Sequence, residues 1–378
     1  MKICIMTTVH EPFDVRIFHK EAKTLVNAGH EVVLIAPSEV KEQVRDEIRI
    51  IGLPRYKRRL FRPLNWINIL WIGLQQKADA YHFHDIELLP IGILIKMLLR
   101  KCVVYDVHEH IELKVLNKEW IPKILRRPIS SFIKWFEPFL AQYMSAIVIV
   151  MENQRRKFAH IGCPIVTLYN FPKKDLFSSI HSKKGDSQNI IFVGGLSVTR
   201  GALILGEIMN WVVKKHPDAS LLIAGKFDTL DTEKRMLECF KKYHIEDHLK
   251  FLGYIPHDEL KRYLNQARVG IFPLQPTSEY PMECQCLPTK LFEYMACEIP
   301  IVGSKMPALE EVMRDLNCGI LVEPTDPKKH AEAIIYLLDN PRVAKQMGEN
   351  GRRAFLERCN WEAISDRLVN LYREVLRC

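Results

Sequence analysis

Two successive series of short apolar runs, each run followed by a segment with helical spacing, constrain this 378-residue chain most strongly. Strands that alternate with helices form mostly parallel sheets with helices packed on both faces. The chain therefore predicts two doubly wound α/β domains. In the first series, the expected strands are 3–7, 31–36, 80–83, 102–106 and 146–150, and the expected helices are 14–28, 87–99 and 121–143.

A polar segment at 172–189, with Lys, Ser and Gly, separates the two series and is the expected linker. We therefore predict one domain over 1–170 and a second over 171–360. In such sheets, ligands bind at the carboxyl ends of the strands, so polar residues that follow strands are candidate site residues. In the second series, the expected strands are 190–193, 220–224, 249–252, 269–272, 300–303 and 319–322, and helices are expected at 326–338 and from 341 onward.

The turn after the first expected strand argues against a nicotinamide enzyme. A dinucleotide-binding domain carries the pattern GxGxxG at this point, because glycines let the backbone approach the pyrophosphate. Residues 7–16 of this chain contain no glycine. A different ligand chemistry is therefore expected.

The excess of positive charge lies in the first domain. Residues 1–170 carry 25 Lys and Arg against 17 Asp and Glu, and the whole chain carries a net charge of +9. Cations at 55–62 precede the apolar segment 64–71, and Arg126 and Arg127 precede the aromatic segment 129–136. Basic residues beside Trp and Phe suit an anionic membrane surface, which we expect as a partner; the alternative is a solvated rim with buried aromatics. No nucleic-acid-binding module is recognisable, so nucleic acid is not expected.

The cysteines and the N-terminus predict a cytoplasmic protein that lies on the inner face of the membrane. The ten cysteines form no CxxC pair, which suits reduced thiols. Only four apolar residues follow Lys2 before Thr7, too few for a signal peptide, and no uncharged apolar run reaches 18 residues. Histidines at 82, 84, 108 and 110 do not complete a metallohydrolase pattern, so we expect no metal and no other cofactor.

Six motifs, in order along the chain, resemble the family 4 retaining glycosyltransferases. This resemblance implies the GT-B fold, with an N-terminal acceptor domain and a C-terminal nucleotide-sugar domain that face each other across a cleft. It also implies that a last helix, at about 361–378, returns to the first domain. The motifs are 7–20 (TTVHEPFDVRIFHK), 81–90 (YHFHDIELLP), 105–109 (YDVHE), 192–201 (FVGGLSVTRG), 251–256 (FLGYIP) and 288–296 (PTKLFEYMA).

The resemblance assigns the donor phosphates to the loop that contains Gly194, Gly195 and Arg200. A cation and helix N–H groups stabilise the charge that grows on a leaving diphosphate. Family members usually have two basic residues in this loop, whereas this chain has Gly195 at the first position. Either Arg16 or Lys290 is expected to replace the missing charge.

A helix beginning at Pro288-Thr289-Lys290-Leu291 is the second element of the expected donor site. The family's matching glutamate, here Glu293, accepts hydrogen bonds from the ribose hydroxyls. The family motif has another glutamate where this chain has Gln285. Glu283 supplies that carboxylate as a catalytic residue, or Gln285 forms hydrogen bonds in its place; both alternatives stay open.

The remaining site residues are also carried over from the family. The nucleobase is assigned to Gly225, Tyr254 and Ile255, and their pattern does not separate UDP from GDP donors. His108 is expected to reach the transferred sugar and the acceptor, and Arg200 acts with it as a catalytic residue. The acceptor side is assigned to Asp14, His84, Asp85 and Glu109.

The predicted function is retaining transfer of a sugar from a UDP- or GDP-sugar to a glycan. The basic, aromatic segments of the acceptor domain favour a lipid-linked precursor of a surface polysaccharide, such as capsule, O-antigen or exopolysaccharide. Two alternatives remain: a nucleotide-sugar epimerase or hydrolase of the same fold, and a catalytically silent binding subunit.

Overall fold

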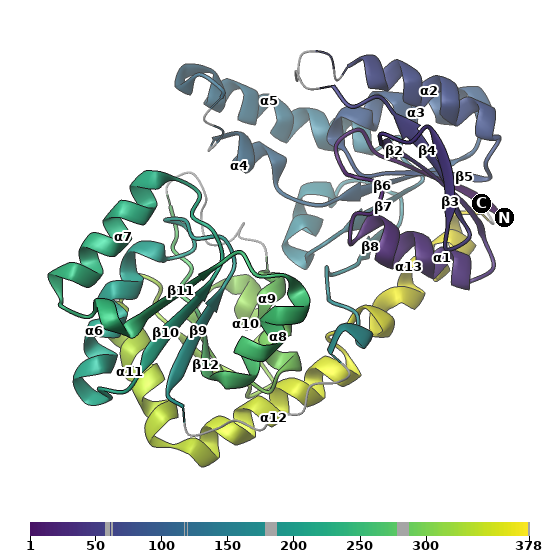
Figure 1. Cartoon of the computed structure of the whole chain (residues 1–378). Helices are drawn as coiled ribbons and strands as arrows, with labels where there is room; N and C mark the ends of the chain where they lie inside the picture. The colour runs from purple at the N-terminus through teal and green to yellow at the C-terminus, as the bar shows by residue number, and fades with distance from the viewer. Residues whose placement is uncertain are drawn as a thin grey trace. The chain divides into compact units, whose positions relative to one another are not determined.

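The computed structural model describes residues 1–56, 61, 63–116, 118, 120–177, 187–277 and 287–376. The chain divides into two compact units (Figure 1). Unit 1 comprises Met1–Asn170 and Trp361–Cys378, and unit 2 comprises Phe171–Asn360. Each unit contains one sheet with helices on both faces, and each is described by itself below.

The sheet of unit 1 has the strand order β3-β4-β2-β1-β5-β6-β7-β8. Neighbouring strands are parallel except β3 and β4, which are antiparallel. The strands are β1 (Lys2–Met6), β2 (Glu31–Pro37), β3 (Glu42–Arg45), β4 (Ile48–Leu53), β5 (Ala80–Phe83), β6 (Cys102–Val107), β7 (Ala146–Ile149) and β8 (Ile165–Thr167).

Helices cover both faces of this sheet. Successive residues of β1, from Ile3 to Met6, are all fully buried, as expected for a parallel strand covered on both sides. Figure 1 shows α2 and α3 on one side of the sheet and α1 and α13 on the other. The helices are the π-helical segment Ile17–Ala22, α1 (Lys23–Asn27), α2 (Leu64–Gln76), α3 (Leu89–Leu99), α4 (Ile111–Leu116), α5 (Lys123–Ala141) and α13 (Trp361–Val375). None of the helices in the described part of the chain has the length and apolarity needed to cross a membrane.

Unit 2 contains an all-parallel sheet with the order β11-β10-β9-β12-β13-β14. Its strands are β9 (Asn189–Val193), β10 (Ser220–Ala224), β11 (Leu249–Gly253), β12 (Ala267–Phe272), β13 (Ile301–Ser304) and β14 (Gly319–Val322). Its helices are α6 (Leu205–Lys215), α7 (Leu230–Lys242), α8 (His257–Gln266), α9 (Thr289–Ala296), α10 (Pro307–Met313), α11 (Pro327–Asp339) and α12 (Pro341–Glu357).

The two faces of this second sheet are packed differently. On one face, α6, α7 and α11 form an apolar core with alternate residues of β9 and β10. On the other face, the hydroxyl of Tyr294 in α9 accepts a hydrogen bond from the Val193 N–H at 2.9 Å and donates one to the Ile191 carbonyl at 3.0 Å. These bonds hold α9 against the central strand β9, which fixes the position of its first turn.

The structure contains elements that the sequence pattern did not predict: β3, β4, α2, α4 and β8. The segment 64–71, expected to contact a membrane, forms the first part of helix α2. The expected helix 14–28 begins three residues later, at Ile17, with a π-helical segment. Pro288 was expected to begin its helix but is the residue before it, with an extended backbone.

Candidate functional site

The candidate site of unit 1 lies at the carboxyl ends of β1, β5 and β6. The loop after β1 is tied to the end of β5, because Asp85 accepts hydrogen bonds from the Thr8 N–H (2.6 Å) and the Thr7 hydroxyl (2.9 Å). The Thr8 hydroxyl also contacts Glu87, at 2.5 Å. Burial raises the pKa of Asp85, which is 7% exposed.

Three histidines gather at this edge of the sheet. Nδ1 of His84 lies 2.9 Å from Nε2 of His108, within hydrogen-bond distance. The ring of His10 lies 5.1 Å from the ring of His108. Burial lowers the pKa of His108 to about 3, although Asp106 opposes this, and burial lowers the pKa of His84 well below its usual value. Both imidazoles are therefore neutral near pH 7.

A buried ionic network lies beneath the histidines. The Arg16 guanidinium donates a hydrogen bond to Asp106 at 2.8 Å, lies 2.8 Å from Glu21, and donates to the Leu168 carbonyl at 3.0 Å. Burial alone would raise the pKa of Asp106, but the charge of Arg16 holds it well below its usual value. Burial raises the pKa of Glu21 well above its usual value despite Arg16. The sequence allowed Arg16 as a donor ligand; in unit 1 its side chain is instead 5% exposed and paired with these carboxylates.

The same network contains the described residues best placed to hold a metal ion. One ligand atom from each of Glu21, His82, His84 and Asp106 lies within 4.8 Å of the others. However, Arg16 already contacts both carboxylates, and His82 Nδ1 lies 2.8 Å from the hydroxyl of Tyr372. The charge of the carboxylates is thus offset by an arginine of the chain itself.

The remaining acceptor-side prediction, Glu109, does not join this cluster. Its carboxylate forms an ion pair with Lys114, and both side chains are partly exposed. In contrast, Asp14 lies beside the histidines. One of its oxygens accepts from the N–H groups of Arg16 (2.8 Å) and Ile17 (3.0 Å), and the other lies 3.5 Å from His10.

The candidate site of unit 2 begins with the loops after β9 and β10, which approach each other closely. A Cβ atom at Gly225 would lie 1.8 Å from the Gly194 carbonyl oxygen, and Gly194 has a φ of +135°. Only glycine therefore fits here. The Arg200 side chain is exposed and its guanidinium donates a hydrogen bond to the Gly195 carbonyl at 3.4 Å.

The first turn of α9 holds an ion pair at the same edge of the sheet. Lys290 Nζ lies 2.7 Å from a carboxylate oxygen of Glu293, whose side chain is 6% exposed. Leu291 is fully buried and anchors the turn. Thr289 is the first residue of the helix. Burying a carboxylate is costly unless it is paired, and Lys290 supplies that partner for Glu293.

Tyr254 and Ile255 follow β11 and lie differently from the rest of the site. The Tyr254 ring is 73% exposed and packs under the ammonium of Lys226, 5.1 Å from the ring centroid. Ile255 is half-buried. These residues present an aromatic ring with its hydroxyl and an apolar side chain, without a charged group of their own. Glu283 and Gln285 lie outside the described residues.

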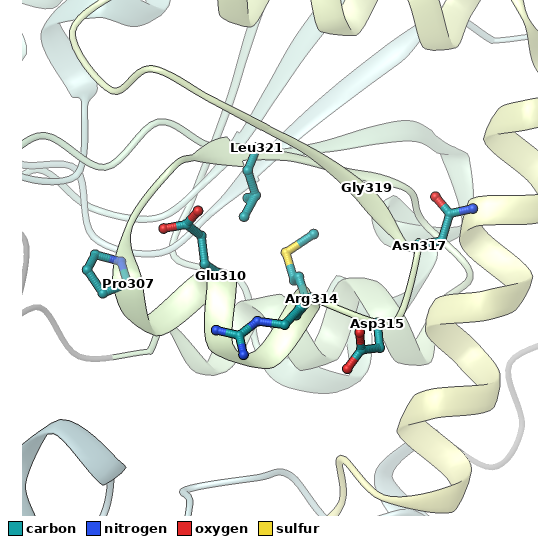
Figure 2. Close-up of a pocket in the computed structure, with 8 residues that line it drawn as sticks. Pro307, Glu310, Arg314, Asp315, Asn317, Gly319 and Leu321 are labelled. Carbon is teal, nitrogen blue, oxygen red and sulfur yellow. The ribbon is translucent and has the colours of Figure 1, made fainter.

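Unit 2 also contains a cavity of about 620 Å³ that shares no residue with the predicted donor site. Figure 2 shows Glu310 of α10, Arg314 just after this helix, and Leu321 of β14 at the cavity. Acidic, basic and apolar side chains line this cavity, and they do not indicate one class of ligand. The sequence did not predict this cavity.

Two family models match the chain, one for each unit. The model "Glycosyltransferase Family 4" matches residues 15–171, and the model "Glycosyl transferases group 1" matches residues 173–354. An MMP α-(1→4)-mannosyltransferase of Mycolicibacterium hassiacum is 33% identical over 310 residues, which cover 80% of this chain and 72% of that protein. The chain belongs to glycosyltransferase family 4.

Other similarities agree with this glycosyltransferase family and its fold. An uncharacterized glycosyltransferase of Methanocaldococcus jannaschii is 28% identical over 93% of this chain and 92% of its own length. Sucrose-phosphate synthase from Thermosynechococcus elongatus superposes with a TM-score of 0.78 at 18% identity, over 100% of this chain and 99% of that one. Anabaena HepE in complex with UDP and glucose gives a TM-score of 0.73 at 15% identity, over 99% and 100%. These structures confirm the GT-B fold of two Rossmann-like domains.

Sequence reasoning named most of the polar residues at the two strand edges but missed His10 and Thr8. Both lie within the motif 7–20, and a signal for His10 was available: it precedes Asp14 by four residues. The contact of Thr8 with Asp85 joins residues 77 positions apart and has no local signal.

Proposed function

We propose that this glycosyltransferase moves a sugar from a UDP- or GDP-sugar to a hydroxyl of a glycan, with retention of configuration. The observation that carries the proposal is that the polar side chains of each unit collect at the carboxyl ends of its parallel strands. In α/β sheets this edge is where ligands bind. A retaining transfer in which the leaving phosphate and the acceptor share one face needs no nucleophile from the enzyme.

Unit 2 is proposed to bind the donor. The Arg200 side chain and the N–H groups after β9 bind the negatively charged diphosphate, and Lys290 is the second cation. Glu293 accepts hydrogen bonds from the ribose hydroxyls, since a carboxylate accepts from two hydroxyls at once. Tyr254 and Ile255 contact the base. HepE, solved with UDP and with UDP-glucose, is a structural neighbour that binds a donor of this class.

Unit 1 is proposed to bind the acceptor, and helix α5 supports a lipid-linked one. Glu137 anchors this helix, because it accepts from the Tyr105 hydroxyl at 3.0 Å and from Lys157 at 2.5 Å. Its outer side is apolar and aromatic, with Lys123, Arg127 and Lys134 exposed beside it. Exposed apolar side chains continue onto α3 and α2, which contact one another. They are Ile124, Leu125, Phe132, Trp135 and Phe139 of α5, Tyr143 just after α5, Leu94, Met97 and Leu98 of α3, and Leu64, Ile67 and Trp71 of α2.

We call the residues just named the membrane-facing surface. Their chemistry fits the interface of an anionic bilayer on the cytoplasmic side. Apolar side chains enter the headgroup boundary while flanking cations contact anionic lipids. Replacing Phe132, Trp135 and Phe139 by Ser should abolish co-sedimentation with phosphatidylglycerol vesicles. The matched control replaces exposed Leu230 of unit 2 by Ser and should bind as wild type. Equal binding by all three proteins would contradict the membrane proposal.

The test of the function is release of nucleotide from a panel of UDP-, GDP- and ADP-sugars, with and without octyl glycosides as acceptors. A transferase releases nucleotide in an acceptor-dependent way and forms a glycoside whose anomeric configuration NMR reports. Release without acceptor would identify the epimerase or hydrolase alternative. Binding without release would identify a silent subunit, which Gly195 in place of a cation favours. We expect full activity after EDTA treatment, because protein cations offset the phosphate charge; a strict metal requirement would contradict this mechanism.

A further inference from the structure

Of the three histidines that gather at the carboxyl edge of the first sheet, His10 is the one to which neither the family resemblance nor the proposed function gives a role. Its side chain is 29% exposed, whereas that of His84 is fully buried and that of His108 is 18% exposed. It is therefore the imidazole of the three that a bound substrate reaches most readily. The ring of His108, the predicted catalytic histidine, lies 5.1 Å away.

The backbone around His10 is held in place rather than loose. The Thr7 hydroxyl oxygen accepts hydrogen bonds from the N–H groups of Val9 (3.2 Å) and His10 (3.0 Å). That hydroxyl donates its own hydrogen to Asp85. A turn built by a threonine side chain and tied to the next strand limits the movement of the imidazole.

Asp14 orients the imidazole of His10. With one oxygen engaged by two backbone N–H groups, the other oxygen of Asp14 lies 3.5 Å from His10 Nδ1. Asp14 is the nearer of the two carboxylates beside the ring, and a carboxylate beside Nδ1 favours the tautomer with its proton there, so that Nε2 is the acceptor. Nε2 lies 3.7 Å from Asp85, and both distances exceed a normal hydrogen bond. Among the described residues no hydrogen bond to Nε2 is found, so Nε2 can accept from an incoming hydroxyl.

The surroundings of His10 also set its protonation. Burial lowers the pKa of His10, but the contact with Asp14 and the charges of Asp85, Asp14 and Asp106 outweigh it and raise the pKa above its usual value. A base is most effective when its pKa lies near the working pH. The titratable groups that contact or act on His10 are Asp14 on its own segment, Asp85 after β5, and Asp106 and His108 at the end of β6.

We propose that Nε2 of His10 accepts the proton of the acceptor hydroxyl during sugar transfer. This inference rests on the proposed function. As the acceptor O–H bond breaks, its proton goes to Nε2 and its oxygen forms the new bond to the sugar C1. The bond from C1 to the donor phosphate breaks, and its electron pair stays on the diphosphate. Nε2 then returns the proton to water, and neutral His108 remains a hydrogen-bonding partner of the sugar.

The first test compares wild type with His10→Gln, using whichever UDP- or GDP-sugar of the panel turns over and octyl β-glucoside as the acceptor probe. A glutamine keeps a polar side chain of similar size but accepts no proton. We expect kcat/KM for the acceptor to fall about 100-fold, because a general base contributes at least this much. Donor binding, measured by titration calorimetry with the nucleotide, should not change. His160→Gln, an exposed histidine of the same unit, is the matched control and should behave as wild type.

The second test is the pH dependence, which a merely structural histidine would not control. Transfer by wild type should decline as the pH falls through the pKa of His10. Asp14→Asn keeps the oxygen that accepts from the backbone but removes the charge, so the acidic limb should move to lower pH. NMR of ¹⁵N-labelled histidine rings reports the same shift directly.

The outcomes separate this inference from the function on which it rests. An acidic limb that stays unchanged in Asp14→Asn, or that persists in His10→Gln with undiminished kcat/KM, would overturn the role of His10 and direct the proton to the donor phosphate. Absence of transfer by wild type with every donor and acceptor of the panel would overturn the proposed function and the role of His10 together.

Discussion

The two units build their ligand-binding edges in opposite ways on the same kind of parallel sheet. In unit 1, titratable side chains interlock: Arg16 joins Asp106 and Glu21, and His84 contacts His108. In unit 2, glycines and backbone groups shape the edge. Gly225 packs against Gly194, and the charged groups there include exposed Arg200 and Lys226 and the Lys290–Glu293 pair.

This difference shows how each edge is preorganised for its proposed ligand. Buried side-chain networks hold acid–base groups at fixed positions and shift their pKa values. Backbone N–H groups and glycine turns present donors to an anion without any side chain in between. The first arrangement suits a hydroxyl that must lose a proton, and the second suits a diphosphate.

The largest effect is expected when the network of unit 1 loses its central carboxylate. Asp106→Ala leaves the buried Arg16 without its partner, and removing one member of a buried ion pair costs about 3–5 kcal/mol. Hydrogen exchange should show lost protection in β1, β5 and β6 and unchanged protection in unit 2. Asp315→Ala, an exposed aspartate of unit 2, is the control. An equal loss of hydrogen-exchange protection in both units would contradict the proposed difference between them.

Acid should weaken unit 1 through its neutral histidines. The pKa of His108 is lowered to about 3 by burial, from 6.5, so the unfolded chain binds the proton first. Stability is therefore full above about pH 6.5 and is lost as the pH falls from 6.5 toward 3, by a few kcal/mol. Urea unfolding at pH 7, 5 and 4 should show this loss for wild type. His108→Gln should flatten the dependence, and an unchanged slope would refute the assignment.

Loss of the carboxylate in unit 2 should weaken nucleotide binding without unfolding. Glu293→Ala removes a charged acceptor, and hydrogen bonds to charged groups contribute about 1.5–3 kcal/mol, or roughly a 10–100-fold weaker Kd. Titration calorimetry with UDP and GDP measures this change in Kd. Glu310→Ala, on α10 beside the separate cavity, should bind as wild type. Wild-type affinity in Glu293→Ala would remove this residue from the donor site.

A smaller effect is expected from filling the glycine contact. In Gly225→Ala the new Cβ would meet the Gly194 carbonyl at 1.8 Å, so the loops must move apart. Overpacking of this kind costs about 1–3 kcal/mol. Thermal melts should show a lower Tm and weaker nucleotide binding. Gly162→Ala has no neighbour within 4 Å and serves as the control; a wild-type Tm for both variants would contradict the close packing.

Much of the fold could be predicted from the sequence because buried parallel strands are continuous apolar runs. The limits of β5, β10 and β14 agree with the predicted 80–83, 220–224 and 319–322. In contrast, β3 is largely exposed, pairs antiparallel at an edge and contains Glu42 and Arg45, so it has no apolar run to detect. Helix α2 was missed because Asn65 and Asn68 interrupt its apolar side and the flanking cations suggested a surface segment.

The candidate site was predictable to the extent that its residues follow strands within one motif. The motifs name His84, Asp85 and His108, and the structure does bring them together: His84 contacts His108, and Asp85 and His108 both lie beside His10. They do not disclose that Arg16 lies inward toward Asp106, a contact between residues 90 positions apart. Long-range pairing of buried charges depends on the packed sheet, and a single sequence carries no record of it. The roles of Glu283 and Gln285 stay predictions.

The division of labour between the units is tested most directly by hydrogen exchange of the whole protein with and without UDP-glucose and GDP-mannose. A ligand that binds only the folded state protects the segments that it contacts. We expect new protection after β9, β10 and β11 and at the start of α9, all within unit 2, and none in the loop after β1. Protection confined to that loop and to the end of β6 would contradict the account, because it would place the nucleotide on unit 1.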